Sequence, residues 1–238
     1  MSNASSEAPF IRVGETVWPV RLVHHAQSRR YKLIFDGARG ELRLTLPRRA
    51  NAARALKWAS EQQDWLNEQV GKSAAPVLVA PGSSLPVFGV DRRVEWTAGA
   101  PRAVRLDGEA LRLGGPAETV GRRIERWLKA EALALMDRES REVAARAGLC
   151  VGRVGVGDPR SRWGSCTHDG DLRYSWRLVM APGHVRRATV AHEVAHLRHM
   201  DHGAAFHALV DELHDGDVDM ARAWLRREGR GLHRYRFV

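Results

Sequence analysis

Apolar and polar residues alternate with a period of two in parts of the chain, which is the pattern of half-buried β-strands. Residues 10–46 predict β structure, and there Leu42, Leu44 and Leu46 alternate with charged or polar residues. Further short strands are expected near residues 92–97 and 103–113.

The most regular alternation lies in residues 171–178 and predicts a strand with one apolar face. Turn-forming residues at 168–170 precede it, so residues 160–166 are expected to be its hairpin partner. The apolar face of this strand consists of Leu172, Tyr174, Trp176 and Leu178.

Other segments show the apolar spacing of helices and few helix-breaking residues. Gly148 is expected to end the longest helix, because glycine readily adopts the conformation that follows a helix. The predicted helices cover residues 51–70, 118–147, 183–199, 204–213 and 217–227.

The order of these segments predicts an α+β fold. Residues 72–86 are rich in Ala, Pro, Ser and Gly and predict a linker or long loop. We expect a disordered polar tail over residues 1–9 and a β-rich region with one helix over residues 10–115. A second domain is expected over residues 116–238.

The composition is typical of a folded globular chain, with 44% hydrophobic and 28% charged residues. Its two cysteines, Cys150 and Cys166, form neither a disulfide framework nor a paired zinc clamp. The longest uncharged run, residues 73–90, contains three prolines and two glycines and cannot form a continuous membrane helix. We therefore expect a cytoplasmic protein with no membrane partner.

The chain is strongly basic, with a net charge of +10 and a pI of about 10.6. This excess of positive charge favours the binding of polyanions, so nucleic acid is a candidate partner through a basic surface. The alternative is that an arginine-rich composition reflects a GC-rich genome, since the charge is spread along the sequence.

Residues 190–207 contain five of the chain's 11 histidines. His192 and His196 are four residues apart, so on a helix their Cβ atoms lie about 6 Å apart on one face. Two such imidazoles can bind one metal ion. Glu193 lies beside the first of them, from where a carboxylate can reach a metal-bound water without ligating the metal.

A catalytic zinc ion usually has a third protein ligand. In a continued helix His199 would lie about 10 Å along the axis from the first histidine, too far to share one ion. Asp201 and Gly203 permit the chain to turn back, because both residue types tolerate the left-handed conformation that ends helices. We therefore choose His202 as the third ligand and keep His207 in reserve.

Three motifs together resemble the YgjP-like branch of the SprT-like zinc metallopeptidases. They are SRWGSC at 161–166, YSWRLVMAP at 174–182 and HEVAHLRHMDHGAAFH at 192–207, and the similarity is closest over residues 159–209. The resemblance implies a zincin-like metallopeptidase domain, in which a small sheet packs on the HExxH helix, preceded by a β-rich region. It also implies one Zn²⁺ ion held by His192, His196 and His202.

The function expected from these features is hydrolysis of peptide bonds in protein or peptide substrates, with Glu193 as general base for a zinc-activated water. The competing hypothesis is a basic, nucleic-acid-associated module with a bound metal, or a protease that processes DNA-linked protein. No zinc ribbon or clear recognition helix supports the competing hypothesis.

Some residues near the motifs are candidates for substrate contact, each with a simpler alternative. Trp163 and Trp176 either line the substrate site or belong to the core, which is the commoner role. Arg162 either contacts substrate or is solvated. The chain departs from the family pattern at Ser175 and Asp201, where asparagine is usual, and at His207, which adds an imidazole near the site.

Overall fold

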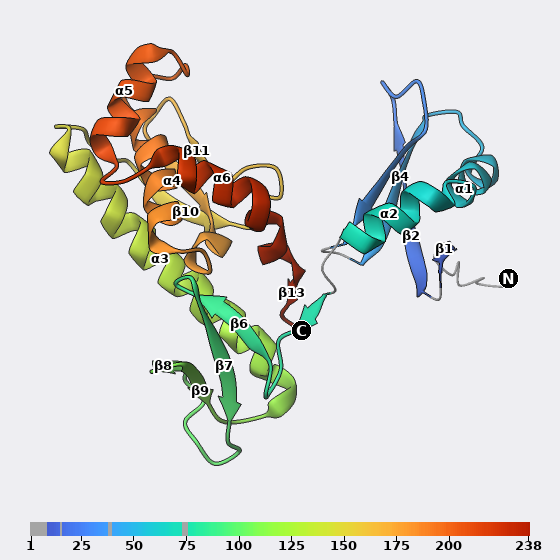
Figure 1. The fold of residues 1–238 in the computed structure, drawn as a ribbon, viewed down its shortest axis with the longest axis horizontal. Coiled ribbons are helices and arrows are strands. Elements are labelled where there is room, and N and C mark those ends of the chain that lie inside the picture. Colours follow the sequence, from blue (N-terminus) through green and yellow to red (C-terminus); the bar gives the residue numbers. More distant parts are fainter. Residues whose placement is uncertain (1–8, 15, 38–39, 73–75) are drawn as a thin grey trace, which may run out of the picture. The chain divides into compact units, whose positions relative to one another are not determined.

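The computed structural model describes residues 9–14, 16–37, 40–72 and 76–238 and confirms an α+β fold (Figure 1). The chain divides into two compact units, residues 1–76 and 77–238. The expected disordered tail lies outside the described residues, except for Pro9.

The first unit is a four-stranded sheet with two helices packed on one face. The strand order is β1-β2-β4-β3, with β2 and β4 parallel and the other two pairs antiparallel. Leu42, Leu44 and Leu46 are fully buried, as their alternation predicts. The elements are β1 (Phe10–Val13), β2 (Thr16–His25), β3 (Lys32–Asp36), β4 (Glu41–Pro47), α1 (Ala52–Ser60) and α2 (Gln63–Lys72).

The single helix predicted over residues 51–70 is two helices, α1 and α2. At the break, side-chain amides donate hydrogen bonds to backbone carbonyl groups. These bonds replace some of the helical hydrogen bonds that the interruption removes. Gln63 donates to the carbonyl oxygens of Ser60, at 2.8 Å, and Arg12, at 3.2 Å. The second contact ties the break to strand β1.

The second unit begins at Val77, so the strands between residues 77 and 113 belong with the helical part of the chain. The boundary expected near residue 115 differs from this division. Its strands are β5 (Val77–Leu78), β6 (Ser84–Val87), β7 (Val90–Trp96), β8 (Arg105–Asp107), β9 (Ala110–Leu113), β10 (Val154–Gly157), β11 (Gly164–Cys166), β12 (Leu172–Ser175) and β13 (Tyr235–Arg236). Its α-helices are α3 (Val120–Arg146), α4 (Gly183–Ala195), α5 (Ala204–Leu213) and α6 (Val218–Glu228), and 3₁₀ segments cover Ala117–Thr119, Trp176–Val179 and Gly229–Arg234.

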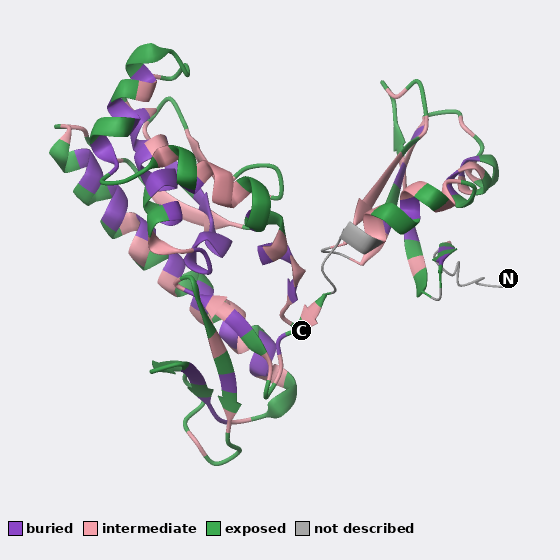
Figure 2. Ribbon diagram, in the orientation of Figure 1, coloured by how far each residue is buried: buried purple, intermediate pink, exposed green. Residues whose placement is uncertain are grey.

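Helix α3 is the long element on which the second unit is assembled (Figure 1). Apolar residues of the β6-β7-β9-β8 sheet share one core with α3, including its Ile124 and Leu128. The helix ends as predicted: Gly148 has a φ of +63°, and its amide donates to the carbonyl of Ala145. Figure 2 shows the buried positions recurring along α3.

The predicted hairpin forms, with β11 antiparallel to β12, but its second strand is shorter than predicted. After Ser175 the chain enters the 3₁₀ segment Trp176–Val179, in which all four residues are buried. The apolar–polar alternation continues to Leu178 although the strand has ended, because Arg177 is buried as well and is paired with Asp158 at 2.7 Å. On its other side β12 pairs in parallel with β10.

Helix α4 is the most enclosed helix of the second unit, and it packs against α3, α5, α6 and β11. It ends at Ala195, earlier than the predicted residue 199. In the part of the chain that the structure describes, no helix is both long and apolar enough to cross a membrane.

A buried ion pair joins α3 to α4. Arg186 donates to both carboxylate oxygens of Glu139, at 2.8 and 3.0 Å, and both residues are less than 10% exposed. A buried charge without its partner is strongly destabilising. This pair therefore fixes the orientation of α4 as well as contributing to its packing.

Replacing Glu139 with alanine is expected to destabilise the second unit by about 3–5 kcal/mol, because Arg186 would remain buried without a partner. Urea unfolding followed by circular dichroism measures the change. Glu142→Ala is the matched control on the same helix, since its ion pair with Arg138 is exposed, and it should cost about 0–1 kcal/mol. Equal losses for the two variants would contradict this role of the pair.

Candidate metal centre

Three imidazoles, from α4, from its C-cap residue and from the turn that follows, converge at the end of α4. The possible ligand atoms of His192, His196 and His202 all lie within 4.8 Å of one another. The Nε2 atoms of His192 and His202 are 3.3 Å apart. In the described residues this is the one group of three or more potential ligand residues that could hold a metal ion.

This donor set fits a zinc ion. Bonds of about 2.0–2.1 Å in a tetrahedral arrangement place neighbouring ligand nitrogens about 3.4 Å apart. The 3.3 Å separation of the two Nε2 atoms matches that value. Imidazole nitrogen is also a common zinc ligand, and three such ligands leave a fourth position open.

The ring of His196 is oriented by the start of the turn. Its Nδ1 lies 2.9 Å from the carbonyl oxygen of His199, so the Nδ1–H tautomer donates there. That tautomer leaves the Nε2 lone pair free for an ion. His199 thus acts through its backbone, and its side chain is not part of the group of three.

The turn that returns His202 to the site does not use the left-handed conformation expected of Asp201 and Gly203. Neither residue has a positive φ; that of Gly203 is −73°. Instead, the Asp201 carboxylate accepts a hydrogen bond of 2.9 Å from the Gly203 amide. This side-chain turn sets the position of His202.

Phe206 forms the apolar backing of the site. It is fully buried, and its ring centroid lies 4.9 Å from His192, 4.5 Å from His196 and 4.7 Å from His202. His207 packs on Phe206 at 5.3 Å but lies outside the group of three ligands.

Burial and the neighbouring imidazoles favour the neutral forms of His192 and His196, and the neutral imidazole is the form that binds metals. Burial, with further effects of His196 and His202, lowers the pKa of His192 to about 4. The pKa of His196 is also lowered, mainly by burial, although its hydrogen bond to His199 acts in the opposite direction.

Glu193 is 5% exposed and lies on α4 next to the first histidine. Burial raises its pKa to about 7, and the positive charge of Arg162 lowers it in part. Its neighbour across the site is Gly164 of β11: a Cβ at Gly164 would lie 2.6 Å from the Cδ of Glu193. The glycine of the SRWGSC motif is therefore required for the carboxylate to occupy this position.

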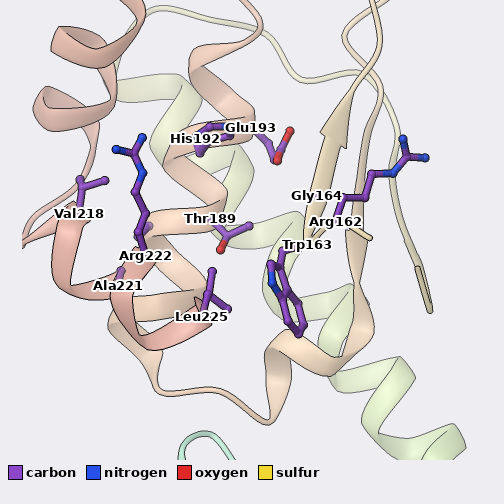
Figure 3. A pocket seen from close by; sticks show the side chains of 11 residues that line it. Arg162, Trp163, Gly164, Thr189, His192, Glu193, Val218, Ala221, Arg222 and Leu225 are labelled. Carbon is purple, nitrogen blue, oxygen red and sulfur yellow. The ribbon is translucent and has the colours of Figure 1, made fainter. Parts of the chain in front are cut away.

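A cavity of about 270 Å³ opens beside His192 and Glu193 (Figure 3). Figure 3 shows α6 on one side of it and Trp163, before β11, on the other. Its lining is mainly apolar, and it consists of Arg162, Trp163, Gly164, Ala188, Thr189, His192, Glu193, Val218, Ala221, Arg222 and Leu225.

The other candidate residues either line this cavity or lie in the hydrophobic core. Trp163 and Arg162 line the cavity. Trp176 is 0% exposed and packs against Phe237 with ring centroids 5.6 Å apart, so it is a core residue with no access to substrate. Burial and the charge of Glu193 raise the pKa of Cys166 to about 11, which leaves a thiol that is not activated as a nucleophile.

The contribution of α6 to the site was missed in the sequence. Val218, Ala221, Arg222 and Leu225 follow the i, i+3, i+4, i+7 spacing of one helix face, so the helix itself was predictable. Nothing in that spacing indicates which element the face meets. The structure places it opposite Trp163, where the two together enclose the cavity.

Comparison with known proteins is consistent with this geometry. The family model described as YgjP-like, metallopeptidase domain, matches residues 31–228, which confirms the resemblance drawn from the three motifs. No curated protein and no solved structure matches the chain significantly. The match includes every residue of the metal centre and of the cavity, and the chain belongs to the YgjP-like metallopeptidase family.

Proposed function

We propose that this chain is a zinc-dependent peptidase in which His192, His196 and His202 hold one Zn²⁺ ion in a zincin-like arrangement. The observation that carries the proposal is the 3.3 Å approach of two Nε2 atoms next to a buried carboxylate that is not part of the ligand group. Membership of a metallopeptidase family supports the same reaction.

When bound, the ion would polarise the scissile carbonyl group and lower the pKa of a water molecule. Glu193 would accept a proton from that water at a carboxylate oxygen and then donate it to the leaving amine. Its buried position keeps it close to the reacting atoms, while Gly164 provides the space for its side chain. Glu193 is therefore assigned as the general base and not as a ligand.

Strand β11 would hold the substrate chain. It lies at the edge of the β10-β12-β11 sheet and packs against α4, so its outer side can pair with an extended peptide. A side chain next to the scissile bond would then enter the cavity between Trp163 and α6. The apolar lining at Val218 and Leu225 favours aliphatic or aromatic side chains.

Glu193→Gln should retain zinc and lose hydrolysis by at least about 100-fold, because the amide cannot accept the proton. Zinc content by mass spectrometry and turnover of a denatured protein substrate measure the two effects. Glu212→Gln, an exposed change on α5, should alter neither. A Glu193→Gln enzyme that still cleaves, or that loses its zinc, would refute the assigned role.

His202→Ala should weaken zinc binding by more than about 100-fold, because loss of a residue that only orients a ligand already costs about 10–100-fold. Competition with a chromophoric chelator gives the affinity. His207→Ala is the matched control, since that imidazole lies outside the ligand group. If the control weakened zinc binding as much as His202→Ala, His207 would replace His202 as the third ligand.

Val218→Phe should lower kcat/KM for peptides with leucine or phenylalanine beside the scissile bond by about 10–200-fold, because it fills the cavity. Peptides with alanine at that position should be affected much less. Met220→Phe on the same helix is the control, because Met220 is exposed and does not line the cavity. A uniform loss on all peptides would argue against the cavity as a side-chain pocket.

A further inference from the structure

Positive charge is concentrated at one end of the sheet in the first unit. Residues 16–60 contain ten lysines and arginines and two carboxylates, Asp36 and Glu41. These two carboxylates are register partners on β3 and β4. They therefore lie together at one end of that strand pair, and the opposite end is left to the basic residues.

Strand direction brings basic residues from separate segments to that opposite end. His25 at the end of β2 pairs with Pro47 at the end of β4, and Lys32 at the start of β3 pairs with Thr45. The connection from β2 to β3 therefore runs at the same end as the connection from β4 to α1. We refer to the side chains gathered there as the basic end: Arg29, Arg30, Lys32, Arg48, Arg49 and Arg54.

The connection from β4 to α1 presents its arginines on a tight turn, and Arg29 and Arg30 follow the turn His25–Ser28 in the other connection. The amide of Ala50 donates to the carbonyl of Pro47 at 3.0 Å, which places Arg48 and Arg49 at the tip of a turn. Helix α1 begins directly afterwards, with Asn51 as its N-cap. The positive end of that helix dipole adds to the potential of the basic end.

The described part of the chain supplies no carboxylate partner to the basic end. All six of its residues are exposed. Among the described residues, none of the six lies within 4.0 Å of a carboxylate. Their charges are therefore available to an external anion.

The chemistry of the basic end fits repeated phosphates better than a protein or a bilayer. Protein interfaces need an apolar centre, and bilayer binding needs apolar anchors. The exposed apolar residues of this sheet, Phe10 and Val17, lie on the β1–β2 pair at the end of β2 away from His25. Guanidinium groups, in contrast, bind phosphate oxygens in a bidentate manner.

We propose that the basic end binds the sugar–phosphate backbone of nucleic acid without reading its sequence. This inference does not depend on the peptidase activity, because it rests on residues of the first unit alone. It predicts binding that falls steeply with salt, as counterions are released from the phosphates.

The test measures binding of the full-length protein to labelled duplex DNA, single-stranded DNA and single-stranded RNA by fluorescence anisotropy over a range of salt concentrations. The test variant neutralises four arginines of the basic end: Arg29→Gln, Arg30→Gln, Arg48→Gln and Arg49→Gln. The control removes the same charge from exposed arginines of the second unit: Arg93→Gln, Arg105→Gln, Arg122→Gln and Arg126→Gln. Circular dichroism checks that both variants are folded.

Each probe that the unaltered protein binds should bind the test variant at least about tenfold more weakly. The slope of log affinity against log salt concentration should become shallower by about one for each phosphate contact removed. The control should keep affinity and slope close to those of the unaltered protein. Comparison of the three probes shows which kind of strand is preferred. The proposal is overturned if both variants weaken equally, or if the unaltered protein binds only vesicles containing phosphatidylserine and none of the three probes.

Discussion

The geometry of the metal centre depends on three imidazole rings packed around one buried phenylalanine. The centroids of all three lie within 5 Å of the Phe206 ring, at 4.9, 4.5 and 4.7 Å. Two rings come from α4, and the third is returned by a turn before α5. Since this turn is closed by a hydrogen bond from the Gly203 amide to the Asp201 carboxylate, the ligand group is assembled largely by local structure around a fixed apolar surface.

The buried carboxylate links this local group to distant parts of the chain. Glu193 fits because β11 presents a glycine to it, and β11 is positioned by pairing with β12. The hydroxyl of Tyr174 on β12 lies 2.9 Å from that of Ser140 on α3, and α3 in turn holds α4 through the Glu139–Arg186 pair. The SRWGSC and HEVAH motifs therefore act as one unit although 25 residues separate them along the chain.

The sequence predicted those features that depend on local spacing. The pairing of residues 164–166 with 172–174 followed from a turn between alternating segments, and the grouping of three histidines followed from helix geometry and a chain reversal. Features that depend on which surfaces meet were not predictable from one sequence. They include the cavity wall supplied by α6, the grouping of strands β5–β9 with the second unit and the break between α1 and α2. The basic end was missed for the same reason: its residues are spread along the sequence, and only the strand directions bring Arg29 and Arg48 to one place.

The central claim is that three imidazole nitrogens converge on one divalent ion and leave Glu193 free. Anomalous diffraction at the zinc edge from crystals of the zinc-loaded protein tests it directly. The account predicts one peak at about 2.0–2.1 Å from a ring nitrogen of each of His192, His196 and His202, with no Glu193 oxygen bonded to the metal. A peak elsewhere, or a zinc ion coordinated by the Glu193 carboxylate in place of His202, would contradict it.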